Sequence, residues 1–412
     1  MLPNLNSQYL FILPLPYSAP SSKASLYGVA YVLTDAAFNI LGQKGYIKCK
    51  GIEYLLPSPV YLFSQGIDPY TIKAQQTEEK FLKELNKRLT TPNLSVFTWS
   101  SRNFKIVEAM ELRNINLSNT LSKLYTAVDI NKVLKLSEIL NTGKITDSDN
   151  LVACAQKYGF QEKPRRDDHF AKLDALLHLV KYLHDNHTAL LNYMLKDFNS
   201  KRAQIAKFIQ EGKCLLDFNV KTKSLEILKP LDLQNDVIKA LYFDGNTVCG
   251  KYYDLLDLKI LSPVAVLTPE RQATTNIDAN SIVLLLNSTD INSIEFDNKS
   301  LPLRMKFFDK FTDVDLKLYT EYSMLDRMSL IEPPLSSSEG FRRFVFLFRG
   351  NNYKGTFIDT ELHSYYKVCR NLLESQFKGY FKEVSGLSNS VNEEDDFELQ
   401  LVKKIQSYPI DL

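Results

Sequence analysis

The first 34 residues of the chain contain no aspartate and no glutamate, although the whole chain has 48 acidic residues. The first apolar run, Tyr9–Tyr17, has the length of a buried strand. It therefore brings no carboxylate to any site.

Pro14 and Pro16 interrupt this run, and proline cannot donate a hydrogen bond to a sheet ladder. We therefore expect the strand to end at or near Leu13.

Other features are also scarce or missing. No apolar run approaches the roughly 20 residues that a membrane span needs. The five cysteines are scattered without paired spacing, which is typical of reduced thiols and not of disulfides or a zinc site. The net charge is only +2, so any basic surface must be local. We expect a cytoplasmic protein with no signal peptide and no membrane partner.

The length and the order of patterns predict more than one domain. A chain of 412 residues can form two or three cores. Apolar runs of strand length precede a helix over Glu78–Leu89, which Thr77 should cap, and a further strand over Leu94–Trp99. A long helix is expected from about Asp168 to Asp197. This alternation predicts an α/β layer with a mixed sheet.

The character of the sequence changes near residue 200 and again near residue 345. Three apolar or alternating runs, separated by Asp, Asn and Gly turns, predict a smaller β-rich domain: Cys214–Leu228, Leu255–Leu267 and Ser281–Leu286. From about Val314 the pattern becomes helical again. The polar, acidic segment Ser385–Asp396 predicts a mobile loop.

Three separated segments resemble one family, bacterial exodeoxyribonuclease I. Leu56–Pro59 and Gln65–Pro69 resemble its proline-rich loop and its Gly-Ile-Thr-Pro turn. His169–Asp174 resembles its final motif, a His and an Asp five residues apart. Phe348–Phe357 resembles its Tyr-Arg-Ala-Arg-Asn-Phe-Pro-Gly-Thr-Leu stretch. The order and spacing match from about residue 9 to residue 408, so the resemblance covers nearly the whole chain.

The resemblance implies a fold in three parts. An RNase H-like exonuclease domain with a mixed sheet would span residues 1–200. A small β barrel like a Src-homology-3 domain would span residues 201–345, and a helical C-terminal domain would span residues 346–412. The changes in sequence character near residues 200 and 345 agree with this division.

The family removes nucleotides from the 3′ end of single-stranded DNA, using two divalent ions, four carboxylates and a histidine general base. Mg²⁺ needs oxygen ligands, so such a site requires several converging carboxylates. The resemblance places Leu13, Leu15 and Ile106 at three of the four ligand positions. Only Asp174 and His169 remain as the fourth ligand and the base. We therefore expect a degenerate metal site.

Nearby acids do not restore this site in the sequence. Glu108 could shift toward it through a bulge, and Asp167 and Asp168 lie beside His169. None of them replaces the missing pair on the first strand. Asp167 or Asp168 is equally well explained as a helix cap, and Asp174 as a solvated residue or a weak ligand of one cation. We expect no cofactor, and Mg²⁺ would serve any residual activity.

Basic and aromatic residues supply candidate contacts to single-stranded DNA. Lys163, Arg165 and Arg166 precede the remnant motif, and Arg349 and Tyr353 lie in the strongest family match. Solvated surface and a helix with one buried face are the structural alternatives. The family also docks the tail of single-stranded DNA-binding protein. Ala279 stands at the position of an arginine expected for that contact.

The sequence therefore predicts an exodeoxyribonuclease I-like protein that has lost catalysis and holds single-stranded DNA ends or partners of DNA repair and replication. A genuine 3′–5′ exonuclease with a rearranged metal site is the enzyme alternative. A protein-interaction scaffold that no longer touches DNA is the third alternative.

Overall fold

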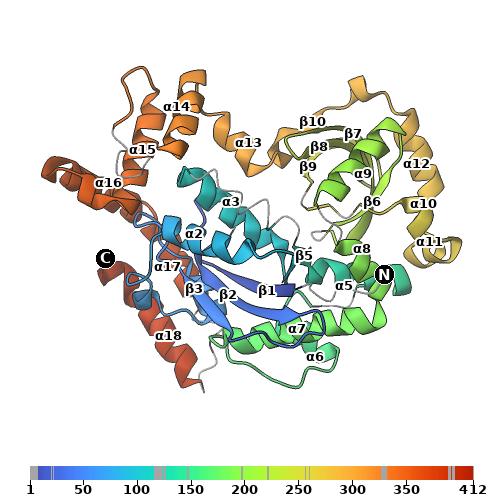
Figure 1. The fold of residues 1–412 in the computed structure, drawn as a ribbon, viewed down its shortest axis with the longest axis horizontal. Coiled ribbons are helices and arrows are strands. Elements are labelled where there is room, and N and C mark those ends of the chain that lie inside the picture. The colour runs from blue at the N-terminus through green and yellow to red at the C-terminus, as the bar shows by residue number, and fades with distance from the viewer. Residues whose placement is uncertain are drawn as a thin grey trace.

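The computed structural model has two sheets flanked by helices, with a helical C-terminal region (Figure 1). It describes residues 8–19, 21, 23–115, 124, 127–145, 148–195, 198–219, 222–255, 257–258, 260–325, 332–387, 391 and 395–411. Within this part of the chain, none of the helices combines the length and apolar character that a membrane span requires.

The first sheet is mixed, as predicted, and has the strand order β3-β2-β1-β4-β5. The central strand β1 pairs antiparallel with β2 and parallel with β4. The strands are β1 (Gln8–Pro16), β2 (Leu26–Asp35), β3 (Gly45–Lys48), β4 (Leu94–Thr98) and β5 (Val128–Asp129).

Helices cover both faces of this sheet. Tyr9, Phe11 and Leu13 pack into one core with α5 and α7, and Leu10 and Ile12 pack into another with α2 and α3. The helix predicted over Glu78–Leu89 is confirmed, with Thr77 as its cap. The helices of this part are α1 (Pro59–Gln65), η1 (Pro69–Thr71), α2 (Glu78–Leu89), η2 (Ser101–Asn103), α3 (Phe104–Arg113), α5 (Ile130–Thr142), α6 (Leu151–Lys157), α7 (His169–Asn186), α8 (Thr188–Met194) and α9 (Phe198–Gln210).

The first strand runs past Leu13, so the predicted strand end was wrong. Tyr17 donates its backbone N–H to Ser25 of the neighbouring chain segment at 2.9 Å. Because ladder groups alternate in direction along a strand, the nitrogens of Pro14 and Pro16 face the opposite side. The pairing with β4 on that side ends at Ile12. Both prolines thus lie where no ladder hydrogen bond is lost, a position that strands tolerate.

The long helix predicted from Asp168 to Asp197 is divided in two. Helix α7 ends at Asn186, and His187, with φ −137°, separates it from α8. Residues 196 and 197 lie outside the described residues.

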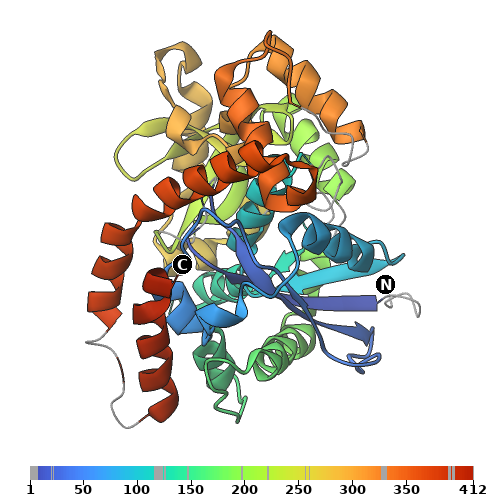
Figure 2. The ribbon, with the colours of Figure 1, turned by 90° about the vertical axis from the view of Figure 1, so that its left-hand side faces the viewer.

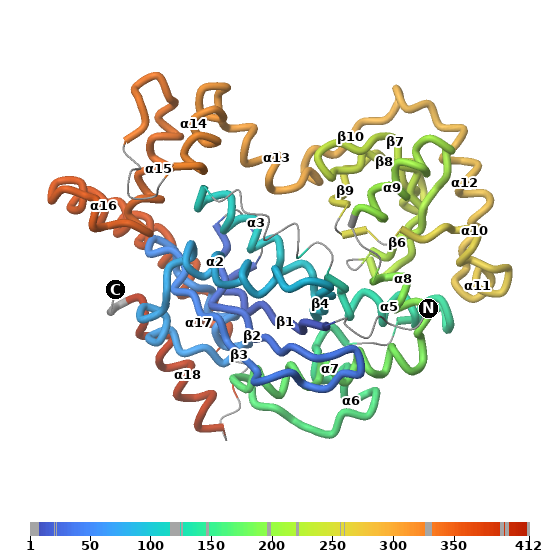
Figure 3. Tube along the Cα trace, viewed as in Figure 1, coloured from blue at the N-terminus to red at the C-terminus, as the bar shows by residue number. Residues whose placement is uncertain are grey.

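The second sheet has the strand order β10-β9-β8-β7-β6, and β6 to β9 form an antiparallel meander (Figure 3). In the described residues no strand pairing joins β6 to β10, so the predicted Src-homology-3-like barrel is not confirmed. The strands are β6 (Leu215–Asn219), β7 (Ser224–Gln234), β8 (Val237–Phe243), β9 (Val248–Asp254) and β10 (Phe296–Asp297).

Two of the three runs predicted as β-rich are helical or irregular. Ser281–Leu286 lies inside helix α12, which Asp278 caps by accepting a hydrogen bond from the Ser281 amide at 3.0 Å. Ala279 and Leu286, seven residues apart, are its buried positions, which is helical and not strand spacing. The run beginning at Leu255 follows the end of β9 and includes helix α10. The helices here are α10 (Pro263–Val266), α11 (Pro269–Thr275), α12 (Ala279–Ser288), η3 (Ile291–Ser293) and η4 (Asn298–Ser300).

The C-terminal region is helical, as predicted, and returns to the first sheet (Figure 2). Helices α17 and α18 pack on α1 and form a core around Leu15. The predicted boundary at residue 345 falls inside α15. The predicted loop Ser385–Asp396 begins inside α17, which continues to Leu387, so its start was wrong. Residues 388–390 and 392–394 of that loop lie outside the described residues. The helices are α13 (Leu303–Phe308), α14 (Asp313–Met324), α15 (Glu339–Asn352), η6 (Lys354–Thr356), α16 (Asp359–Glu374), α17 (Phe377–Leu387), α18 (Asp396–Ser407) and η7 (Tyr408–Asp411).

Candidate functional site

The C-terminal half of β1, where the resemblance places two metal ligands, is apolar and buried. Leu13 is 7% exposed and belongs to the core that includes Leu173 and Leu176 of α7. Leu15 is 2% exposed and packs in the core around α1 and the C-terminal helices, which includes Leu62. Neither side chain has an oxygen that could ligate a cation. This part of the strand is a packing surface.

Ile106, the third expected ligand position, lies in a different core. It is fully buried on α3 and packs with Leu10 and Ile12 on the face of the sheet opposite to Leu13. The structure therefore does not bring Ile106 and Leu13 into one cluster.

The remaining expected ligand, Asp174, is paired with a cation. Lys44, in the connection between β2 and β3, forms an ion pair and hydrogen bond with the Asp174 carboxylate. Both side chains are partly buried. The positive charge of Lys44 competes with a metal ion for the carboxylate, so Asp174 is poorly suited to hold a cation.

His169, the expected general base, is the first residue of α7 and is buried. Its ring centroid lies 5.7 Å from that of Tyr46, and its Nδ1 atom has no hydrogen-bond partner. Burial, helped by the nearby charge of Lys172, lowers the pKa of His169 to about 4. The imidazole is therefore neutral at physiological pH and fills space in the core.

The acids that could have shifted toward this site have other partners. Glu108 is buried and pairs with Arg304 of α13 at 3.3 Å. Asp167 pairs with Arg165 at 2.9 Å. Asp168 caps α7 by accepting a hydrogen bond from the Ala171 amide at 2.9 Å, which confirms the capping alternative.

The donor set does not fit a two-metal site. In the part of the chain that the structure describes, no three His, Cys, Asp or Glu side chains gather where they could hold a metal ion. The positions at the end of β1 supply only hydrocarbon, and Asp174 is neutralised by Lys44.

The basic run before α7 divides into exposed and structural residues. Lys163 is exposed, and the side chain of Arg165 is 71% exposed. Arg166 instead pairs with Glu398 of α18 at 2.6 Å, and its guanidinium lies 4.4 Å from the centre of the Phe63 ring. Arg166 thus joins the first part of the chain to the C-terminal helices.

The two candidates in the strongest family match are both held by protein groups. Arg349 is 7% exposed, pairs with Glu361 at 3.3 Å and lies over the Phe357 ring at 4.8 Å. Tyr353 donates a hydrogen bond to Glu79 of α2. The two residues stabilise the junction of α15 with its neighbours, which favours the alternative of a helix with a buried face.

Sequence reasoning missed Lys44 and Glu398. Lys44 is 130 residues from Asp174, and Glu398 is 232 residues from Arg166. No spacing in the sequence links residues so far apart. The only signal in the sequence is that the two members of each pair have opposite charges.

The sequence matches no protein-family model and no curated protein. A product-bound exonuclease I structure is similar with a TM-score of 0.76 and 17% identity, over 98% of this chain and 100% of that one. A zinc-bound complex of E. coli exonuclease I with single-stranded DNA has a TM-score of 0.72 and 16% identity, over 98% and 99%.

A third structure, of SSB/exonuclease I in complex with the inhibitor CFAM, has a TM-score of 0.73 and 15% identity, over 98% of this chain and 99% of that one. Structural similarity at such low sequence identity establishes the fold and not the activity. The chain has the fold of exonuclease I along nearly its whole length.

Proposed function

We propose that this protein binds single-stranded DNA without hydrolysing it. The observation that carries the proposal is the end of β1, where Leu13 and Leu15 are buried within a fold shared with exonuclease I. A metal-dependent nuclease needs carboxylates at the scissile phosphate, and this strand brings none.

The Lys44–Asp174 ion pair supports the loss of catalysis independently. Lys44 gives Asp174 a partner of opposite charge within the protein. The enzyme alternative, an exonuclease with a rearranged Mg²⁺ site, would require Asp174 to leave this lysine. It would also require further carboxylates, whereas Glu108 and Asp167 are paired with arginines.

DNA binding is supported by the complexes of exonuclease I with single-stranded DNA and by exposed cations in this chain. Lys163 and Arg165 are the exposed members of the basic run, and we assign them to phosphate contacts. Arg165 also pairs with Asp167 at 2.9 Å, but 71% of its side chain stays exposed to a phosphate. Arg166, Arg349 and Tyr353 are tied to protein groups, so we assign them a structural part. A role among cytoplasmic partners of DNA repair or replication, including the tail of single-stranded DNA-binding protein, would follow.

A binding titration at several salt concentrations tests this proposal. Labelled single-stranded oligonucleotide should bind at low salt, and its affinity should fall with salt because each phosphate contact releases about 0.7 counterion. Lys163→Ala with Arg165→Ala should flatten the slope of log affinity against log salt by roughly 1–1.5 units. Arg166→Ala is the matched control and should leave the slope unchanged. If the parent protein shows no binding at low salt, the scaffold alternative replaces the proposal.

A further inference from the structure

Helix α12, at the right-hand edge of Figure 1, is apolar on all sides. Five consecutive residues, Ile282–Leu286, are aliphatic, and successive residues of a helix lie about 100° apart, so the run covers the whole circumference. A helix of this kind is normally buried. Here one side packs on β7 and β8, and Leu286 is the only member of the run that is buried. Leu284 is 70% exposed and Leu285 is 41% exposed, and we call these two residues the α12 face.

The surroundings of the α12 face are acidic. From residue 272 to residue 298 the chain has four acids and no lysine, arginine or histidine. The acids are all exposed, and none forms an ion pair with another described residue: Asp278, Asp290, Glu295 and Asp297. Asp278 precedes α12 and Asp290 follows it, so a carboxylate stands at each end of the helix. Lys229 of β7 donates to the Leu286 carbonyl at 3.3 Å, on the packed side.

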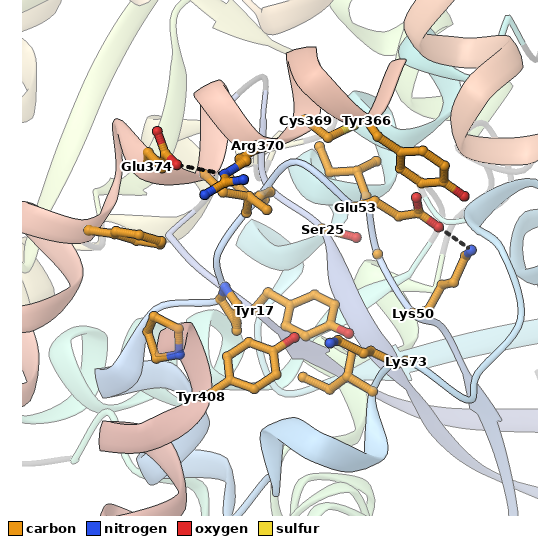
Figure 4. Close-up of a pocket in the computed structure, with 18 residues that line it drawn as sticks. Tyr17, Ser25, Lys50, Glu53, Lys73, Tyr366, Cys369, Arg370, Glu374 and Tyr408 are labelled. Atoms are coloured by element: carbon orange, nitrogen blue, oxygen red, sulfur yellow. Dashed lines mark hydrogen bonds and ion pairs between the residues drawn. The ribbon is translucent and has the colours of Figure 1, made fainter. Parts of the chain in front are cut away.

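The cavity of about 850 Å³ between the end of β1 and the C-terminal helices differs from this open face (Figure 4). Its lining residue Tyr17 is only 3% exposed. Lys50 pairs with Glu53 at 3.0 Å, and Arg370 pairs with Glu374 at 2.9 Å (Figure 4). These charges have partners within the protein, whereas the leucines and acids of α12 face solvent.

Charge and symmetry distinguish the possible occupants of the α12 face. Single-stranded DNA and anionic lipid are attracted by cations, and this face has none. A second copy in a twofold dimer would set the face against itself, and acids would meet acids. An apolar segment with lysine or arginine at its ends would instead cover the leucines and complement Asp278 and Asp290.

We propose that the α12 face docks a basic amphipathic helix of a partner protein. Leu284 and Leu285 contact the apolar side of that helix, and Asp278 and Asp290 attract the cations at its two ends. One helix lying on another buries less surface than a stable complex does, so the contact is transient. Docking here is independent of DNA binding, which we assign to Lys163 and Arg165.

Titration of the full chain with a labelled synthetic peptide of leucine and lysine tests this proposal. The peptide carries leucines along one side of a helix and lysines on the other side and at both ends. One peptide should bind per chain, as measured by fluorescence anisotropy. The same peptide with glutamate in place of lysine, and an oligolysine of equal length, should each bind roughly tenfold more weakly or worse. The first is repelled by the acids, and the second has no apolar side.

Three variants locate the contact. Leu284→Gln should weaken binding of the leucine–lysine peptide roughly tenfold and leave the melting temperature unchanged, because the side chain is exposed. Leu335→Gln, at a leucine that is 89% exposed ahead of α15, is the matched control and should bind like the parent. Asp290→Asn with Glu295→Gln should weaken binding at low ionic strength and have little effect in high salt, which screens exposed charges.

The outcomes separate this proposal from its alternatives. Absence of saturable binding, equal affinity for the lysine and glutamate peptides, or equal affinity of Leu284→Gln and the parent overturns the proposal. A dimer of the free chain in sedimentation that Leu284→Gln abolishes also overturns it, because a second copy would then cover the face. If the peptide binds as expected and no oligonucleotide binds, the docking face stands and the DNA-binding function fails.

Discussion

Lys44 changes what Asp174 can do, although Asp174 is the acid that the resemblance retains. In a nuclease this carboxylate would face a divalent ion, whereas here it faces an ammonium group from the β2–β3 connection. An ammonium satisfies the charge of the acid without activating water or a phosphate. The pair and the leucines on β1 are consistent with one another, because each removes a reason for metal to bind.

Restoring the strand-one acids should destabilise the protein. Leu13→Asp with Leu15→Glu would put two carboxylates among buried hydrocarbon, at a cost of roughly 2–5 kcal/mol in the free energy of unfolding. Denaturant unfolding measures this cost. The matched control Leu13→Met with Leu15→Met keeps the sites apolar and should cost under about 1.5 kcal/mol per site. Equal stability of the acidic variant and the parent would mean that this strand is not buried.

His169 makes stability depend on pH in a defined window. Its folded pKa of about 4 lies below the ordinary value of 6.5, so the unfolded chain takes up a proton at higher pH than the folded one. The free energy of unfolding should fall as pH drops from about 6.5 to about 4, with a contribution of up to about 3 kcal/mol from this residue. His169→Phe should flatten that slope in unfolding curves. An unchanged slope would assign the dependence to other groups.

At the scale of elements, the end of α15 is a junction. Asn351 accepts a hydrogen bond from the Glu53 amide at 3.2 Å, and Asn352 donates one to Asn114 at 2.9 Å. Tyr353 reaches Glu79 on α2. The segment that most resembles exodeoxyribonuclease I therefore joins α15 to the first part of the chain.

Removing the Tyr353 hydroxyl should affect stability and not DNA binding. Tyr353→Phe deletes the hydrogen bond to Glu79, and a bond to a charged group contributes about 1.5–3 kcal/mol. Thermal unfolding should show the loss, while the salt dependence of oligonucleotide binding stays the same. Tyr366→Phe, at a half-exposed ring, is the control for stability. Lower DNA affinity with an unchanged melting temperature would instead make Tyr353 a DNA contact.

Helices with a strong local pattern could be predicted from the sequence, whereas an element whose ends depend on distant segments could not be bounded correctly. The Thr77 cap and the apolar face of Glu78–Leu89 are both visible within a dozen residues. The end of β1 depends on which side of the strand lacks a neighbour, and that is decided by β4, some 80 residues later. The apolar run Ser281–Leu286 is compatible with a strand or with a helix. In the structure it is helical, and Asp278 caps this helix.

The sequence shows which acidic residues the candidate site lacks, but it does not show which contacts the remaining residues make. The absence of acids before Asp35 is plain in the sequence, as are Leu13 and Leu15. The pairing of Asp174 with Lys44 depends on the meeting of distant segments, which no periodicity encodes. Arg349 is similar, because a basic residue beside aromatic rings suits both a DNA contact and a buried ion pair.

At the scale of the whole molecule, buried ion pairs tie the first part of the chain to the second sheet. Lys132 of α5 pairs with Asp217 of β6 at 3.0 Å, and both side chains are nearly buried. Arg304 contacts Glu108 of α3 at 3.3 Å and Asp254 of β9 at 2.8 Å. The apolar core around α7 also continues into Leu216 and Phe218 of β6. Polar and apolar contacts thus fix the two sheets relative to each other.

Removing Arg304 should weaken this connection strongly. Arg304→Met removes the cation that the buried Glu108 and Asp254 share, and breaking such a pair costs about 3–5 kcal/mol. Burial already raises the pKa of Glu108, and Asp254 raises it further, while Arg304 opposes both. The stability deficit of the variant should therefore shrink as pH falls and Glu108 takes up a proton. A deficit that does not change with pH would contradict this assignment.

Incubation with a 3′-labelled single-stranded oligonucleotide and Mg²⁺ or Mn²⁺ tests the central claim most directly. The apolar end of β1 and the Lys44–Asp174 pair predict that the label stays on full-length DNA, under conditions in which the same preparation binds the oligonucleotide. Metal-dependent release of labelled nucleotide that disappears in Asp174→Ala would contradict the account, because it would show that this carboxylate still serves a working nuclease site.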